Sequence, residues 1–181
     1  MTTIKGNTKV IHYGLLAAAM WLTLSSCHKI IELPATPHTE FRSFAVFDTT
    51  DILGNDCKGG RLKFYFEDGD GDLGLKSADE GATDTSNLFF SLYSKSAGVF
   101  SEVTDPLMKP SNYRIPYMER TGRNKILKGI IDITFFYEFY NPSDSGIFKY
   151  RFYIKDRADN VSDTVWTCEI PLSKNNTYTG E

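Results

Sequence analysis

Apolar and polar residues alternate with a period of two in segment after segment of this chain beyond residue 40. In RLKFYFE, residues 61–67, one leucine and two phenylalanines fall on one side of an extended backbone. The segments IDITFFYEFY, residues 131–140, and GIFKYRFYIK, residues 146–155, alternate in the same way. Such alternation is typical of a strand with one buried and one exposed face. These three segments are therefore predicted to be half-buried strands.

Further extended segments raise the expected number to about seven strands. They are separated by loops rich in Gly, Pro, Asn and Asp, and no long segment has the helical period. The predicted fold is an all-β, immunoglobulin-like antiparallel β-sandwich, with a closed barrel as the alternative. The additional segments are FRSFAVFD (41–48), NLFFSLYSK (87–95), NYRIPYM (112–118) and TVWTCEI (164–170).

This strand order also predicts which loops are neighbours. Alternate connections of an up-and-down antiparallel arrangement lie at the same end, so the loop DGDGD, residues 68–72, is expected beside KDRADN, residues 155–160. A further short strand at VFSEV, residues 99–103, would break that parity. We therefore expect two acidic loops to meet at one end of the sandwich.

The first residues have the features of an export signal. Lys5 and Lys9 supply a basic start, and an apolar run from Val10 to Leu24 follows. A membrane-spanning helix is the alternative, but it needs about 20 apolar residues, and this run is shorter and contains His12. We expect a signal peptide that is removed.

The run ends at Leu24–Cys27, which resembles the lipobox of bacterial lipoproteins. The resemblance implies a signal peptide over residues 1–26 and a diacylglyceride on Cys27, with the acyl chains anchoring the protein to a membrane. The residue after Cys27 is His28 and not the Asp that signals retention in the inner membrane. The resemblance therefore implies the outer membrane, and it does not say which leaflet. The expected plan continues with a tether over 27–40, a β-sandwich domain over 41–173 and a C-terminal tail over 174–181.

The charge and the cysteine content restrict the possible partners of the protein and the compartment in which it is found. Without Lys5 and Lys9 the chain keeps 18 basic and 23 acidic residues, a net charge of -5, and no basic run appears in the domain. This balance argues against a nucleic-acid partner. Outside the cytoplasm the remaining pair, Cys57 and Cys168, favours a disulfide, whereas a cytosolic address would leave thiols.

The densest chemistry lies in FEDGDGDLG, residues 66–74. Carboxylates 4 Å apart repel by about 1 kcal/mol even in water, so a cation is a natural neighbour. The alternating positions of Asp68, Asp70 and Asp72 would turn their oxygens toward one Ca²⁺, with Asp156 or Asp159 completing the set. The alternative is that Asp-Gly pairs are ordinary turn formers whose exposed charges are screened by salt.

The acidic stretch and the later segment YRFYIKDRADNVSDTV, residues 150–165, together resemble a pattern of uncharacterised cell-envelope lipoproteins of Bacteroidetes type. That resemblance implies an immunoglobulin-like domain framed by these two loops and a lipid-anchored address. It brings no activity, since the family has none established. Asp159 stands where the similar turn has Gly, which Asp tolerates at modest cost.

Catalytic chemistry has little support in the sequence. The three histidines, at positions 12, 28 and 38, fall in the expected signal or tether, so a Ser-His-Asp nucleophile is not expected in the domain. The alternative function is a glycan-active hydrolase with a carboxylate pair drawn from Glu67, Asp68 or Glu138. We expect no catalysis and no catalytic residue.

A binding surface is the better-supported expectation. Aromatic side chains on outward strand positions could stack on sugar rings or dock an envelope protein, although cross-strand pairing needs no ligand and is the favoured explanation of these side chains. The expected function is therefore a lipid-anchored, non-catalytic binding or structural module of the cell envelope. The candidate binding face consists of Tyr65, Phe136, Tyr140 and Tyr153.

Overall fold

The structure is a computed structural model that describes residues 33–76, 85–119, 125–137 and 146–180. These residues form strands and loops, and they include no helix that could cross a membrane. The expected signal peptide, Cys27 and most of the expected tether lie outside them. The strands within the described ranges are β1 (His38–Thr50), β2 (Asp56–Asp68), β3 (Leu88–Ser96), β4 (Val99–Glu102), β5 (Leu127–Tyr137), β6 (Ile147–Ile154), β7 (Val165–Trp166), β8 (Ile170–Pro171) and β9 (Asn176–Thr179).

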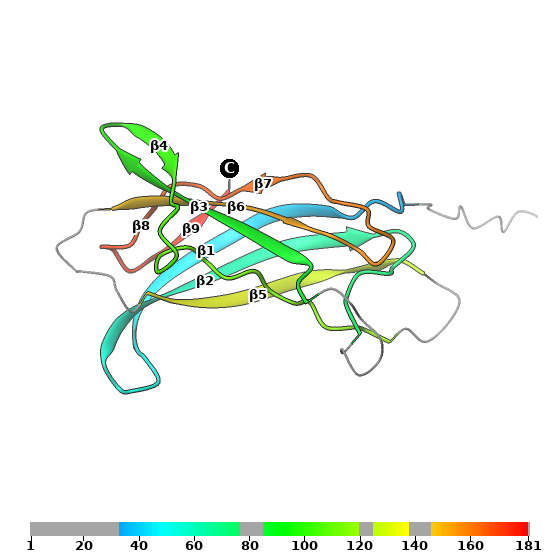
Figure 1. Ribbon diagram of the computed structural model, residues 1–181, viewed down its shortest axis with the longest axis horizontal. Helices are drawn as coiled ribbons and strands as arrows, with labels where there is room; N and C mark the ends of the chain where they lie inside the picture. Colours follow the sequence, from blue (N-terminus) through cyan, green and yellow to red (C-terminus); the bar gives the residue numbers. More distant parts are fainter. Residues whose placement is uncertain (1–32, 77–84, 120–124, 138–145, 181) are drawn as a thin grey trace, which may run out of the picture. The chain divides into compact units, whose positions relative to one another are not determined.

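The strands form two antiparallel sheets, which are the two layers of a sandwich (Figure 1). One sheet has the order β5-β2-β1-β9, and the other has the order β4-β3-β6-β7, with β8 also paired to β6. Strands β1 to β3 can be labelled A, B and C, β4 is then C′, and β5 to β7 are E, F and G. With these labels the sheets read E-B-A, followed by β9, and C′-C-F-G. This is the strand grouping of immunoglobulin-like domains, so the predicted fold class is confirmed.

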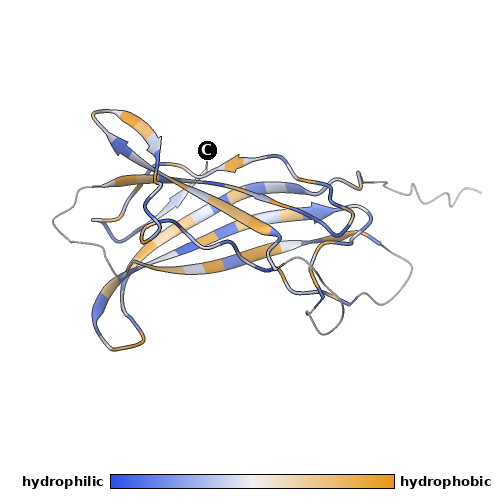
Figure 2. Ribbon diagram, in the orientation of Figure 1, coloured by the Kyte–Doolittle hydropathy of each residue, from blue (hydrophilic) through white to orange (hydrophobic). Residues whose placement is uncertain are grey.

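The alternation read from the sequence places a single core between the sheets. Along β2, Leu62, Phe64 and Phe66 are at most 4% exposed, whereas Arg61 and Lys63, at the alternate positions, are exposed. Along β6, every second residue from Phe148 to Ile154 is buried. Apolar and polar segments accordingly alternate along the ribbons (Figure 2).

Aromatic rings from both sheets fill the centre of this core. The Tyr150 ring stacks on Phe44 and Phe135, with centroids 5.5 and 5.1 Å apart. The rings of Phe64 and Phe152 lie 4.9 Å apart. Each such pair contributes about 0.5 to 1.5 kcal/mol beyond the burial of its area. The two layers are therefore joined by ring contacts as well as by the hydrophobic effect.

The segment NYRIPYM, residues 112–118, is not a strand, so that prediction was wrong. Its pairing is limited to isolated bridges at Tyr113 and Pro116. Proline has no N–H for a ladder, and the Ile115 N–H donates to the side chain of Asn87 at 2.7 Å. The segment runs extended without joining a sheet.

Two other segments differ from the simple plan. VFSEV, residues 99–103, supplies a real strand, β4, which pairs with β3. TVWTCEI, residues 164–170, is interrupted, because the Tyr150 N–H donates to the Thr167 hydroxyl at 3.0 Å. One strand, β4, is gained, and the expected 112–118 strand is lost. The number of strands between residues 68–72 and 155–160 is therefore unchanged, so these two loops are still expected at the same end of the sandwich.

The domain boundaries expected at residues 41 and 173 were too narrow. Strand β1 begins at His38, and the compact unit begins at Leu33. Strand β9 lies within the expected tail and pairs with β1, with Tyr178 opposite Phe44. Four residues are too few to show a period of two, so the sequence could not distinguish this strand from a tail.

The expected disulfide between Cys57 and Cys168 does not form in the structure. Cys57 shares the odd-numbered positions of β2 with Arg61 and Tyr65, which face away from the core. Cys168 lies in the link between β7 and β8 of the other sheet. Alternation along β2 therefore turns the Cys57 side chain away from the second layer.

Candidate metal centre

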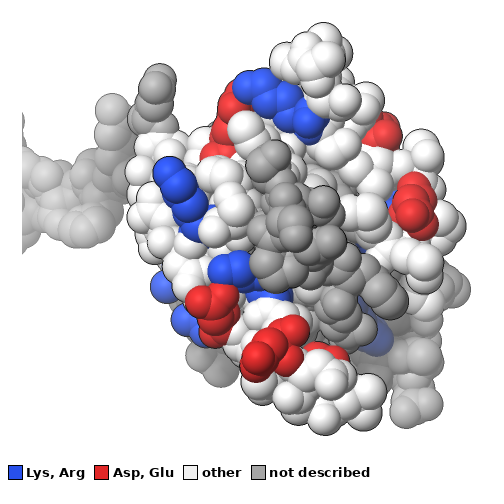
Figure 3. Space-filling model, turned by 90° about the vertical axis from the view of Figure 1, so that its left-hand side faces the viewer, with Lys and Arg blue, Asp and Glu red and all other residues white. Residues whose placement is uncertain are grey.

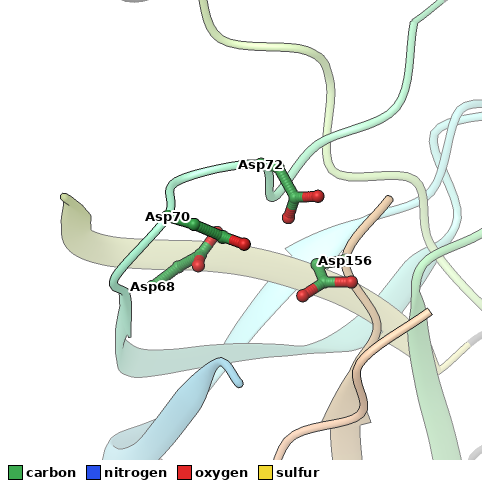
Figure 4. Close-up of side chains that lie close together, drawn as sticks. All are labelled: Asp68, Asp70, Asp72 and Asp156. Carbon is green, nitrogen blue, oxygen red and sulfur yellow. The ribbon is translucent and has the colours of Figure 1, made fainter. Parts of the chain in front are cut away.

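Four aspartates meet at the end of the sandwich where β2 and β6 both finish (Figure 4). Asp68 is the last residue of β2, and Asp156 lies two positions beyond the end of β6. Both continue the inward-facing alternation of their strands, and each is only 1% exposed. Asp70 and Asp72 come from the loop after β2. The expected meeting of the 68–72 and 155–160 loops is thus confirmed.

The four carboxylates converge on one small volume. One oxygen from each side chain lies within 4.8 Å of the others, and the side chains are turned toward a shared space (Figure 4). A Ca²⁺ ion binds oxygens at about 2.3 to 2.6 Å, so oxygens on opposite sides of it are about 4.6 to 5.2 Å apart. The four oxygens are therefore close enough together to belong to one such coordination shell.

Three oxygens in the cluster have no hydrogen-bond partner among the described residues. They are the Oδ1 atoms of Asp68, Asp70 and Asp72, and all three are buried. Buried polar atoms are almost always paired, and leaving one without a partner costs about 1 to 3 kcal/mol. A cation at the centre would satisfy all three oxygens at once.

The electrostatics of the cluster also favour a positive charge. Burial, followed by the proximity of Asp70, raises the pKa of Asp68 to about 6, although the Leu73 N–H opposes the shift. Burial raises the pKa of Asp72 as well, and the charges of Asp156 and Asp70 add to it. A bound cation would compete with protons for these oxygens, because only the ionised carboxylates are good ligands.

Glycines allow the loop to fold back on itself. Gly71 and Gly74 have φ angles of +64° and +100°, a region that favours glycine. A Cβ on Gly74 would lie 2.5 Å from the Pro116 carbonyl oxygen, and one on Gly69 would clash with the carbonyl of Leu33. The glycines between the aspartates therefore serve tight backbone contacts as well as turning.

Arg157 ties the two acidic loops together. Its Nη1 donates to the Gly74 carbonyl at 2.7 Å, and its guanidinium lies 4.9 Å from the centre of the Tyr117 ring. Its charge lowers the pKa of Asp72, against the larger upward shift. The sequence analysis missed this residue, although its place beside Asp156 in the second loop was a usable signal.

Of the two candidates in the second loop, the structure brings Asp156 into the cluster and not Asp159. Asp159 is exposed, has a φ angle of +67° and pairs with Lys155 at 3.0 Å. Asp156 is held by Asn160, whose backbone N–H and side-chain amide each donate to it at 2.8 Å. The spacing of Asp156 and Asn160 is the sequence signal for this turn.

The predicted aromatic binding face is divided between the two sheets. Tyr65 and Phe136 lie on β2 and β5 of one sheet, Tyr153 lies on β6 of the other, and Tyr140 is outside the described residues. The Tyr153 ring stacks on its cross-strand neighbour Phe89 at 5.0 Å. The single face was therefore a wrong prediction, and cross-strand pairing accounts for Tyr153.

The outer face of the second sheet carries a different aromatic group. The Arg151 guanidinium lies 5.4 Å from the centre of the Tyr93 ring and 5.8 Å from that of Trp166. Trp166 is 44% exposed. Trp166 was missed as a surface residue because the sequence pattern placed it within a continuous strand.

The comparisons with known proteins assign no family. No protein-family model matches the chain, and comparisons with curated proteins and with solved structures give no match. The resemblance to Bacteroidetes-type lipoproteins stays a prediction. The interpretation of the site accordingly rests on the geometry of its own residues.

Proposed function

We propose that this protein is a calcium-binding, lipid-anchored β-sandwich of the bacterial cell envelope that acts as a non-catalytic binding or structural module. The observation that carries the proposal is the set of three buried aspartate oxygens without partners, within the four-aspartate cluster. Calcium at this position would join the ends of the two sheets through β2 and the loop after β6. It would stiffen that end of the domain.

The ligand set favours Ca²⁺ over other common cations. All four side chains offer carboxylate oxygens, which suit hard cations, whereas zinc sites in proteins usually include Cys or His. Mg²⁺ demands near-ideal octahedral geometry at about 2.0 to 2.1 Å and usually keeps several waters, whereas Ca²⁺ accepts six to eight oxygens in flexible geometry. Calcium tolerates the irregular approach of two strand ends and a glycine-rich loop.

The plain-turn interpretation explains less of the geometry. Turn-forming aspartates are normally exposed, and salt screens their charges. Asp68 and Asp156 are instead buried. One oxygen of Asp68 accepts a hydrogen bond from the Leu73 N–H at 2.8 Å, and the other has no donor within the described ranges. A turn alone gives no reason to bury like charges together.

The proposed location in the cell envelope is supported by the N-terminal residues and by the net charge of the rest of the chain. The lipobox-like residues 24–27 support lipidation of Cys27, and the net charge of -5 beyond the leader disfavours nucleic acid. On the side of the molecule in Figure 3, basic and acidic side chains are interspersed without a broad basic patch among the described residues. The proposed partners are the membrane, through the lipid, and a glycan or envelope protein.

The hydrolase alternative gains no specific support from the structure. Glu67 and Asp68 are neighbours on β2, so their side chains point to opposite faces and cannot flank one glycosidic bond. Glu67 accepts a hydrogen bond from the Tyr65 hydroxyl at 2.9 Å. His38 begins β1 and pairs with Asp163 at 3.0 Å, although the sequence analysis placed it in the tether. Glu138 is outside the described residues.

Thermal unfolding tests the proposal on a chain that begins at residue 28, which keeps the whole compact unit from Leu33 onward. Sites in extracellular modules bind calcium with dissociation constants of about 10⁻⁴ to 10⁻³ M. At 10 mM calcium the stabilisation would then be about 1.4 to 2.7 kcal/mol, which raises the melting temperature by about 3 to 10 °C.

Two matched samples make this result specific. Magnesium at the same concentration controls for ionic strength and divalent charge, and it should give a clearly smaller shift. A chelator alone sets the baseline. Identical melting curves in calcium and in chelator would refute calcium binding and leave the turn interpretation.

A further inference from the structure

A cavity of about 290 Å³ lies at the opposite end of the sandwich from the aspartate cluster. Its wall includes Tyr137, which pairs with Lys58 near the start of β2, whereas Asp68 ends that strand. Small-molecule sites in proteins typically occupy about 300 to 1,000 Å³. The volume therefore fits one small molecule, and the cavity is separate from the proposed metal centre.

The inner part of the cavity is apolar. Leu92, Phe135, Phe148 and Leu172 belong to the core, are at most 8% exposed, and form part of its lining. They come from β3, β5, β6 and the turn after β8, so both sheets contribute. An apolar body would displace water from this surface, which is favourable because apolar area is removed from water.

Tyrosine hydroxyls supply the polar part of the lining. The Tyr137 and Tyr150 oxygens lie 2.5 Å apart, so one hydroxyl donates to the other. Each tyrosine has a single O–H, and among the described residues the second hydrogen of this pair has no acceptor. Tyr113 contributes a third phenol ring to the lining. Burial raises the pKa of both Tyr137 and Tyr150, so they remain donors at neutral pH.

The outer part of the lining carries one charge. Lys109 is the only charged residue among the described lining residues, and it is exposed. Beside it, Leu107 is 71% exposed and Met108 is 47% exposed. The cavity thus combines an apolar interior, tyrosine hydroxyls that can donate hydrogen bonds, and the positive charge of Lys109. Its described lining residues include no carboxylate.

We infer that this cavity binds a small apolar carboxylic acid. The ring or short hydrocarbon chain of the ligand fills the apolar interior. Its carboxylate supplies acceptors for the tyrosine hydrogens and a negative charge for Lys109. A neutral ligand of the same shape would gain the apolar contacts but lose the charge, and a cation would be repelled. This inference does not depend on calcium binding.

Calorimetric titration of the chain from residue 28 with 3-phenylpropionate tests the inference, with 3-phenylpropanol as the matched neutral probe. We expect saturable one-to-one binding of the acid, and affinity at least tenfold weaker for the alcohol, which corresponds to 1.4 kcal/mol. No saturable binding of the acid, or equal binding of acid and alcohol, would overturn the inference.

Three variants locate the bound molecule. Tyr113→Phe removes one hydroxyl while keeping the ring, and Lys109→Met removes the charge while keeping the length; each should weaken binding of the acid several-fold. Leu92→Trp fills the cavity and should abolish binding. Because Leu92 is a core residue, the two conservative variants stand as the test if that variant does not fold.

The matched control is Lys63→Met, since Lys63 lies on the outward face of β2 beside Asp132. Its affinity for 3-phenylpropionate should equal that of the parent chain. Unchanged affinity in both Tyr113→Phe and Lys109→Met would place the probe elsewhere and contradict the inference.

Discussion

Asp156 and Asp159 stand three positions apart in one loop and have opposite environments. Asp156 is buried, held by Asn160 and turned into the aspartate cluster. Asp159 is exposed and pairs with Lys155. The sequence could not choose between them, because both follow a strand by a few residues and the choice depends on which one continues the inward alternation of β6.

The two aspartates provide a matched pair of variants. Asp156→Asn removes one ligand charge from the cluster and should weaken calcium binding by on the order of ten- to a hundredfold. Asp159→Asn removes the same charge from the same loop and should leave the affinity within about twofold, since exposed pairs contribute little. Calorimetric titration with calcium measures both.

The interpretation of the cluster would be wrong if the two substitutions weakened binding equally, because a general loss of negative charge would then explain both. Circular dichroism of each variant without calcium provides the control for folding. Loss of the fold in Asp156→Asn would shift the comparison to Asp70→Asn, which alters a ligand outside the turn that Asn160 closes.

At the scale of elements, the turn between β3 and β4 contains a local strain that can be tested. Ala97 and Gly98 both have positive φ angles, +48° and +83°. Two-residue hairpin turns of this type favour Asn or Gly at the first position, where Ala is disfavoured. Ala97→Gly should therefore raise the free energy of unfolding by about 0.5 to 1 kcal/mol.

Urea denaturation measures this effect, and Ala45→Gly is the control. Ala45 lies within β1, where glycine costs about 0.5 to 1 kcal/mol through the entropy of the unfolded chain. The two variants should thus move the urea midpoint in opposite directions. A fall in the midpoint for Ala97→Gly would contradict the strained turn.

Long alternating segments were predictable from the sequence, and short or side-chain-paired ones were not. The segments around Phe64 and Phe152 each have enough alternating positions to fix a strand and its buried face. Residues 112–118 have a similar pattern but form only isolated bridges. Pro116 has no N–H to donate to a neighbouring strand, and the Ile115 N–H donates to the Asn87 side chain instead. Strand β9 shows too few positions for any pattern.

The candidate site was predictable in part for the same reason. The alternating aspartates of residues 68–72 mark a dense set of ligands, and loop parity placed them beside residues 155–160. The roles of Arg157 and Asn160 depend on side-chain geometry across two loops, which a linear pattern does not encode. The aromatic face failed because outward positions on two sheets cannot be assigned to one surface before pairing is known.

At the scale of the whole molecule, the two proposed sites are separated along the strands. The aspartate cluster lies where β2 meets the start of β5, and the cavity lies where β5 ends. The chain enters the compact unit at the cluster end, because the Gly69 N–H donates to the Pro34 carbonyl at 3.0 Å. The proposed calcium site and the entry of the chain into the compact unit thus share one loop.

The proposed anchor is tested by Cys27→Ser in the full chain, expressed in a bacterium that processes lipoproteins. The parent protein should incorporate labelled palmitate and sediment with the membrane fraction. The variant should incorporate no label, because serine cannot form the thioether to the diacylglyceride. Palmitate labelling that persists in the variant would contradict lipidation at Cys27.

The most direct measurement is the anomalous scattering of crystals of the chain from residue 28 grown in calcium, with crystals grown in chelator as the reference. The account predicts a single strong anomalous peak about 2.3 to 2.6 Å from oxygens of Asp68, Asp70, Asp72 and Asp156. The peak should vanish in chelator. A calcium-soaked crystal with no peak among these four side chains would contradict the account.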